Sequence, residues 1–192
     1  MPTLGKKHLR RAIDSALRAK IKPVLYPDGA QAIVAVSAAI SDIQDQVIVR
    51  APDWDEPIAP WGHRLRHMAS TEQSHYSLLV WLDDDNVLHD NPLGTLSEFS
   101  EEEAYLFTVK APPQLGNCFP VGEPGAGNLD GLGIVVPGAL AAKIPWPHCD
   151  NGNSVTTYAG DWEYFKALIA AGVKINRIDH FIGQLNPTWN LP

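Results

Sequence analysis

Three consecutive carboxylates, Asp83, Asp84 and Asp85, are the residues of this sequence best suited to chemistry. The run that precedes them, LLVWL at 78–82, is continuously apolar, as expected of a strand buried on both faces. Acids at the carboxyl end of such a strand lie at the sheet edge where open α/β sheets bind ligands. Their hard oxygen atoms suit Mg²⁺ or Mn²⁺, with a substrate phosphate completing the coordination shell. The alternative is an acidic, solvated turn.

The segments that must position these acids alternate between helical and strand patterns. Apolar residues at helical spacing predict helices at 6–18, 61–74, 137–142 and 161–172. Short apolar runs predict strands at 23–26, 47–49, 78–82, 105–109, 132–136 and 174–178. The segment 32–43 fits a helix by its Ala and Ser content and a strand by its β-branched residues. This alternation is typical of a single α/β domain.

Composition limits the classes of function. The chain has 192 residues, of which 45% are hydrophobic and 19% charged, so it can bury a proper core. A net charge of −7 argues against broad electrostatic binding to nucleic acid or anionic lipid. The two cysteines lack the spacing of a zinc site. With no apolar run of membrane-spanning length and no signal-peptide pattern, a cytoplasmic protein is predicted.

Four segments, taken in order, resemble the GT-A glycosyltransferases, especially the inverting nucleotide-sugar transferases called family two. Residues 2–17 resemble the first loop and helix of that family, and 24–29 its second strand, which ends in an acid. Residues 62–68 resemble its Arg-Asn helix and lead to 82–85 at the usual spacing, and 160–162 resembles its acidic motif at a helix start. The resemblance implies one Rossmann-like GT-A domain over 1–192, with a mostly parallel central sheet flanked by helices.

The sequence departs from this family at its start. Family members carry a central strand just before the Pro-Thr segment, which is Pro2-Thr3 here, and the sequence begins at Met1. We therefore expect this first strand to be missing, or its place to be taken by another segment such as 33–36.

The resemblance implies a donor site around the carboxylates. It assigns Asp85 to direct binding of Mn²⁺ or Mg²⁺, and Asp83 to the metal or the ribose. A late histidine, His180, is the candidate third metal ligand, although a lone histidine is more often structural. Because side chains alternate along a strand, Asp84 is expected to point away from Asp83 and Asp85. Asp84 is nevertheless kept among the nucleotide-sugar-binding residues.

Further roles follow from the same resemblance. Asp161 is the candidate catalytic base, and an N-cap aspartate is the alternative. Asp28 is expected near the nucleoside, or simply as a residue of the turn that follows its strand. Arg66 is expected as a cation near the nucleotide, or as a surface arginine. Pro2 and Thr3 complete the nucleotide-sugar-binding set, and the segment 128–131 could contact the donor sugar or the acceptor.

These residues predict metal-dependent transfer of a sugar from a nucleotide diphosphate sugar, with a UDP-sugar favoured, to an unidentified hydroxyl acceptor. A base at Asp161 favours inversion of the anomeric carbon. The alternative is a catalytically silent GT-A-like protein that binds a nucleotide or a glycan. A sugar nucleotidyltransferase would also use a metal ion at the edge of a sheet. Such an enzyme should carry a glycine-rich, basic loop near its start, and Gly5-Lys6-Lys7 is too short to be that loop.

Overall fold

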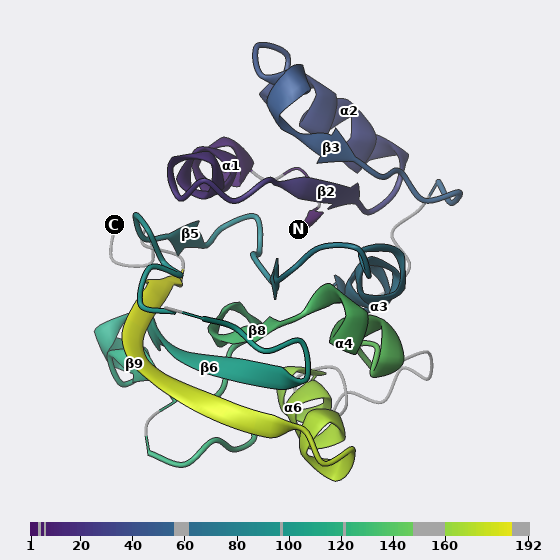
Figure 1. Ribbon diagram of the computed structural model, residues 1–192. Helices are drawn as coiled ribbons and strands as arrows, with labels where there is room; N and C mark the ends of the chain where they lie inside the picture. Colours follow the sequence, from purple (N-terminus) through teal and green to yellow (C-terminus); the bar gives the residue numbers. More distant parts are fainter. Residues whose placement is uncertain are drawn as a thin grey trace.

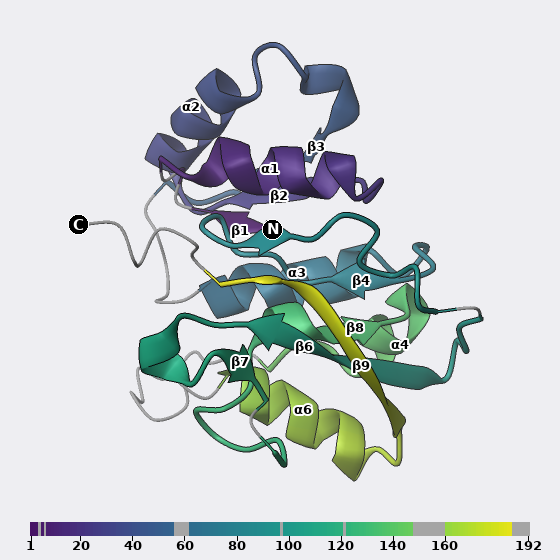
Figure 2. The same cartoon turned by 90° about the vertical axis from the view of Figure 1, so that its left-hand side faces the viewer.

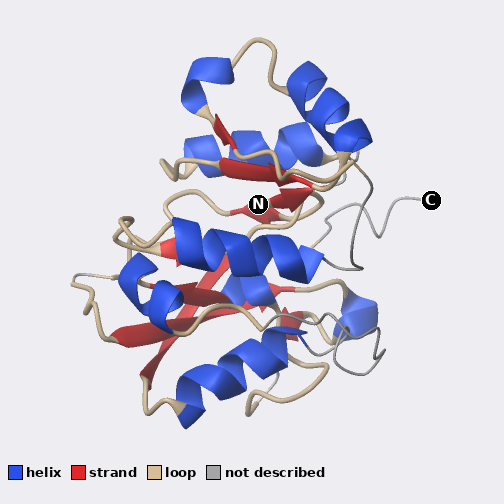
Figure 3. Cartoon of the chain, turned by 90° about the vertical axis from the view of Figure 1, so that its right-hand side faces the viewer, coloured by secondary structure: helices blue, strands red, loops and turns tan. Residues whose placement is uncertain are grey.

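The computed structural model describes residues 1–3, 5, 7–55, 62–96, 98–120, 122–147 and 160–185 (Figure 1). Helices and strands alternate, as the sequence pattern predicts, and the strands form a three-stranded and a six-stranded sheet. In the views from the two sides the smaller sheet lies above the larger one, with helices above the smaller sheet, at the level between the two sheets and below the larger sheet (Figures 2 and 3). The α/β class is therefore confirmed.

The three-stranded sheet is entirely parallel. Its order is β1 (Pro2–Thr3), β2 (Val24–Pro27) and β3 (Ile48–Val49). The first strand is thus short rather than missing. Two residues suffice because Met1 also bonds to β2: its ammonium donates to Val24 O at 2.7 Å, and its carbonyl accepts from Tyr26 N at 2.9 Å.

Two helices cover this sheet on its outer side, α1 (Leu9–Arg18) and α2 (Ala30–Ala39). The ambiguous segment 32–43 is therefore helical over most of its length. One face of α2 packs through Val36 into a core shared with α1 and β2, while Val34 on the opposite face is 71% exposed. A strand in the interior of a sheet would have buried both Val34 and Val36. A short apolar run fits either a helix or such a strand, so the sequence alone could not decide between them.

The six-stranded sheet is mixed. Its order is β4 (Leu79–Val80), β8 (Ile134–Val136), β6 (Glu103–Lys110), β9 (Lys174–Gln184) and β5 (Val87–Leu88), with β7 (Cys118–Phe119) also paired to β6. Only the β6–β9 pairing is parallel. The expectation of mostly parallel strands thus holds for the smaller sheet alone. Parallel neighbours need a long crossover, whereas a short loop such as the one between β6 and β7 returns the chain antiparallel.

The remaining helices are α3 (His63–Glu72), α4 (Gly138–Lys143) and α6 (Gly160–Ala170), with short 3₁₀ helices at Gln44–Gln46, Pro113–Leu115 and Gly131–Gly133. Helix α6 lies against the outer side of the larger sheet (Figure 2). Its buried Tyr164 and Leu168 join Leu65 of α3 and the buried Trp146 in one core. None of the helices in the described part of the chain combines the length and apolarity that a membrane crossing requires.

Candidate active site

The acidic segment follows β4 and turns at once. Asp84 and Asp85 lie in a turn in which Asn86 N donates to Asp83 O at 3.2 Å. Asp84 is only 4% exposed, whereas Asp83 and Asp85 are partly exposed. Asp84 thus points into the protein, as predicted, but from a turn and not from a continued strand, while Asp83 and Asp85 remain partly exposed.

Asp84 ties the two sheets together. The hydroxyl of Thr3, at the end of β1, donates to Asp84 Oδ2 at 2.8 Å and accepts a hydrogen bond from Gly5 N, also at 2.8 Å. Both Thr3 and Asp84 are buried. The structure therefore brings the predicted Pro2-Thr3 segment to the acids after β4, as expected of one site, but the side chains of Thr3 and Asp84 bond to each other.

The Thr3–Asp84 hydrogen bond should contribute to the stability of the fold. Replacing Thr3 with Ala removes a hydrogen bond to a buried carboxylate, so we expect the free energy of unfolding to fall by about 1.5–3 kcal/mol. Thr3→Ser keeps the hydroxyl and should lose much less. Urea denaturation of both variants measures the difference, and equal losses in the two would show that the hydroxyl contributes nothing.

Helix α1 holds the acidic turn from the other side. An Arg11 guanidinium nitrogen donates to Asp85 O at 3.2 Å, and one turn later Ser15 Oγ accepts the N–H of Leu88 at 3.0 Å. Positions 11 and 15 lie on one helix face because they are four residues apart. The sequence analysis missed this role, because a polar pair on an amphipathic helix is ordinarily a solvated surface.

Arg66 of α3 lies at the centre of the site. It is 5% exposed, its guanidinium bonds to Asp83, and it stacks over Trp146 at 5.2 Å from the ring centroid. Burial opposes its charge, but the nearby carboxylates of Asp83, Asp161 and Asp130 outweigh burial and raise the pKa of Arg66. Arg66 is thus a buried counter-ion, and the surface-arginine alternative is wrong.

Asp161 lies in the first turn of α6. Its carboxylate accepts the backbone N–H of Gly131, which comes from a different part of the chain. Burial raises the pKa of Asp161 to about 6, and the charge of Arg66 works in the opposite direction. A carboxylate with a pKa close to neutral is well matched to taking a proton near pH 7.

A buried aromatic pair fixes the start of this helix. The His63 ring lies so close to Gly160 that a Cβ at Gly160 would be 2.0 Å from the ring. His63 Nδ1 accepts the indole N–H of Trp146 at 3.0 Å. Since the indole nitrogen only donates, Nδ1 must be unprotonated in this bond. No motif in the sequence marks His63, and in the structure its ring packs against Gly160, the first residue of α6.

Asp130 is a second carboxyl beside Asp161. Burial, then the charges of Asp161 and Asp83, raise the pKa of Asp130 to about 8. The sequence analysis included Asp130 only as part of a loop that could contact sugar. The short segment Asn128 to Gly131 carries no motif, so only folding could reveal that its acid faces Asp161.

Asp28 lies where β2 ends, next to β1. Its N–H donates to Thr3 O at 2.8 Å, and its side chain accepts the indole N–H of Trp54 at 3.0 Å. Arg64 of α3 stacks over the same Trp54 ring, 4.5 Å from its centroid. Asp28 is 6% exposed. Asp28 therefore lies beside the end of β1, and its carboxylate is bonded to Trp54.

His180 is not brought to the acidic turn. It lies on β9, three residues before Gly183, which pairs with Leu88 of β5. Because the two strands are antiparallel, His180 lies roughly 10 Å further from Asp85 along the ladder than Leu88 does. Its charged neighbour is instead His89, whose pKa is lowered by burial, by Lys110 and by His180.

The carboxylates fit a metal ion that is held partly by a ligand better than one held by protein side chains alone. Asp83 and Asp85 offer the hard oxygen ligands that suit Mg²⁺ or Mn²⁺. Within the described ranges, however, no three His, Cys, Asp or Glu side chains gather in a way that could hold a metal ion. Mg²⁺ is often held by one or two carboxylates together with substrate phosphates. The donor set therefore fits an ion held jointly with a phosphorylated ligand.

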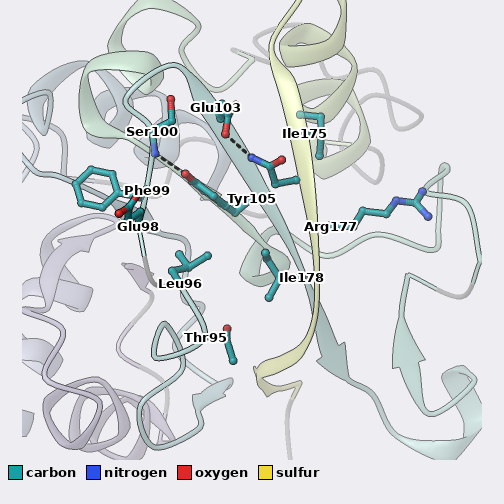
Figure 4. Close-up of a pocket in the computed structure, with 11 residues that line it drawn as sticks. Thr95, Leu96, Glu98, Phe99, Ser100, Glu103, Tyr105, Ile175, Arg177 and Ile178 are labelled. Atoms are coloured by element: carbon teal, nitrogen blue, oxygen red, sulfur yellow. Dashed lines mark hydrogen bonds between the residues drawn. The ribbon is translucent and has the colours of Figure 1, made fainter.

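A separate hollow of about 640 Å³ lies on the larger sheet, between residues 95, 96 and 98–100 on one side and strands β6 and β9 on the other (Figure 4). Its lining includes Phe99, Tyr105 and Arg177, and Asn176 donates to Glu103 at 2.6 Å on its floor. None of the carboxylates around Arg66 lines it. This hollow is therefore distinct from the candidate active site.

Comparisons with known proteins identify the fold. No protein-family model and no curated protein matches the sequence. Two crystal structures of S. aureus TarS residues 1–349 match the structure with a TM-score of 0.65, one at 14% identity and one, in complex with UDP, at 12%. They cover 97% and 95% of this chain, and a crystal structure of TarS at TM-score 0.63 and 12% identity covers 97%.

TarS is a glycosyltransferase of the GT-A type. This chain has a glycosyltransferase fold. At 12–14% identity the likeness shows the fold and not a particular family within it. The chain spans 59%, 58% and 36% of the three matched chains. The glycosyltransferase resemblance that the sequence motifs implied is thus confirmed at the level of the fold.

Proposed function

We propose that this chain transfers a sugar from a nucleotide diphosphate sugar, a UDP-sugar in the simplest case, to an acceptor hydroxyl, with inversion and with Mg²⁺ or Mn²⁺. The observation that carries the proposal is the meeting of Asp83 and Asp161 around Arg66, 78 residues apart in sequence, in a fold shared with TarS. The UDP complex of that neighbour supports a uridine nucleotide as the donor's leaving group.

In this proposal Asp83 and Asp85 would hold a divalent ion together with the donor diphosphate, and such an ion would supply positive charge beside the leaving group. Asp85 is held in place by Arg11, which bonds its carbonyl oxygen. Asp28, Thr3 and Pro2 form the neighbouring edge, where the nucleoside end of the donor would lie. The buried Asp84 supports that edge through Thr3.

Asp161 acts as the base. It removes the proton from the acceptor hydroxyl while that oxygen attacks the anomeric carbon, and a single displacement of this kind inverts the configuration. Its raised pKa allows it to accept this proton near neutral pH. A base in this role also requires that water, a competing acceptor, be excluded from the site.

A second candidate function is a catalytically silent protein that binds a nucleotide. One observation favours it: Arg66 bonds to Asp83, so a carboxylate proposed for the metal is already neutralised by a buried cation. Such a protein would bind UDP and Mn²⁺ without turning over any donor.

The donor site is tested by thermal unfolding with UDP and Mn²⁺. Ligand at 100 times its dissociation constant adds about 2.7 kcal/mol to the stability of the folded state, so a clear rise in melting temperature is expected. The rise should disappear in Asp85→Ala and persist in Asp90→Ala, a matched acid that is exposed just after β5. The absence of any rise with every nucleotide diphosphate would contradict the donor site.

Activity is tested by a donor screen that detects release of nucleotide diphosphate, followed by NMR of the product's anomeric proton. Inversion is expected from the proposed base. Binding of UDP without turnover of any donor would favour the silent protein, and a retained anomeric configuration would overturn the single displacement.

A further inference from the structure

Asp130 carries a role that no sequence motif assigns. It precedes the 3₁₀ helix at Gly131–Gly133, and its Oδ1 accepts the N–H of Leu132 at 2.9 Å. Its carbonyl oxygen also accepts the N–H of Gly133 at 3.0 Å. Both the side chain and the backbone of Asp130 therefore fix the turn that contains Gly131.

This turn directs one N–H to Asp161. Gly131 N donates to the Asp161 carboxylate, so one residue joins the fixed turn to the proposed base. The approach leaves no spare room, because a Cβ at Gly131 would lie 3.1 Å from Asp161 Oδ1 and 3.1 Å from the Trp146 ring. The position of the Asp161 carboxylate thus depends on the shape of the turn that Asp130 stabilises.

Asp130 also acts on Asp161 through its charge. The groups that face Asp130 come from three other elements: Arg66 of α3, Asp83 after β4, and Asp161 of α6. Three carboxylates share one buried guanidinium, and that guanidinium bonds to Asp83. Since like charges at close range disfavour one another's ionised form, Asp130 and Asp161 must influence each other's proton affinity.

We propose that Asp130 is a positioning residue for Asp161, because its side chain fixes the turn whose Gly131 N–H holds the Asp161 carboxylate. The role in catalysis rests on the function proposed above, while the hydrogen-bonded turn and the electrostatic coupling do not. Asp130 therefore contributes to the reaction without touching the acceptor.

Two substitutions distinguish the effect of the hydrogen bond in the turn from the effect of the carboxylate's charge. Asp130→Asn keeps an oxygen that can accept the Leu132 N–H and removes the charge, whereas Asp130→Ala removes both. We expect Asp130→Ala to lower kcat at least tenfold with UDP affinity within twofold of the parent. Asp130→Asn should recover most of this kcat, because its amide oxygen can still accept the Leu132 N–H and keep the turn in place.

Titration tests the proposal without any need for turnover. In protein labelled with ¹³C at the aspartate carboxyls, the pKa of Asp130 should fall in Asp161→Asn, because the charge of Asp161 contributes to its raised value. Glu123→Gln, which changes an exposed acid that pairs with Arg177 in the same loop, should leave the pKa of Asp130 unchanged. An Asp130 pKa that is the same in Asp161→Asn and in the parent would overturn the coupling.

A glycine pair tests the turn. Gly131→Ala should displace the Asp161 carboxylate and lower kcat at least tenfold, while Gly125→Ala, where a Cβ meets open space, should leave kcat within twofold. Equal kcat in Gly131→Ala and the parent would overturn the positioning role. A parent that transfers no sugar would overturn the proposed function alone, since the titration decides the coupling by itself.

Discussion

Replacing Asp161 with Asn should lower kcat for sugar transfer by about 10²–10⁴-fold, the usual contribution of a general base. The amide is nearly the same size as the carboxylate and its oxygen can still accept the Gly131 N–H, so α6 and its contacts should persist. Because the donor site lies with the acids after β4, affinity for UDP with Mn²⁺ should stay within about threefold of the parent. Steady-state kinetics and UDP titration measure the two quantities separately.

The matched control is Glu163→Gln, in the same first turn of α6. Glu163 is an acid that pairs with Lys166 on the helix surface at 2.8 Å, and its removal should leave kcat within twofold. An Asp161→Asn variant as fast as the parent, with acceptor present, would remove Asp161 from the chemistry. Equal losses in both variants would point to the helix start and not to the base.

Replacing Arg66 with Ala should lower the free energy of unfolding by about 3–5 kcal/mol at pH 7, because Arg66 is buried and its loss leaves three partly buried carboxylates without their cation. The pKa values of Asp130 and Asp161 already lie above the usual range, and loss of Arg66 should raise them further. A carboxyl whose folded-state pKa is raised costs stability as pH rises above its unfolded value of about 3.9. The loss in Arg66→Ala should therefore be largest at pH 7–8 and shrink toward pH 4.

Denaturant unfolding at pH 4.5 and pH 7.5 measures this difference. Arg18→Ala is the control, since Arg18 is also a helical arginine near an acid but pairs with Asp90 at 3.6 Å on the surface. Exposed ion pairs contribute about 0–1 kcal/mol, so its loss should be small at both values of pH. A small loss in Arg66→Ala that does not depend on pH would contradict the buried counter-ion.

The strands and helices that could be predicted from the sequence are those whose apolar pattern is long or bounded by turn residues. Helix α1 and strands β2 and β6 lie where their periodicity predicts them. Strands β1, β5 and β7 have two residues each, too few for any pattern, and are defined by their hydrogen-bonded partners. Strand direction was also beyond the sequence, because side-chain alternation is the same in parallel and antiparallel pairs.

Among site residues, the sequence by itself determined the types and the local spacing. It placed three acids after an apolar run and another acid in the first turn of α6. These features depend on neighbours within a few residues, which the sequence contains directly. The strand in that run is only Leu79–Val80, half-buried at the edge of its sheet, so the predicted burial of 78–82 on both faces was wrong.

Only the tertiary structure decided which of these groups meet. It brought Asp130 beside Asp161, buried Arg66 among three carboxylates, and left His180 along β9 beside His89. Each of these outcomes joins residues far apart in the chain, and their proximity depends on how the sheets and helices pack. Packing is a property of the whole core, so the charges that tune this site become visible only once that core is formed.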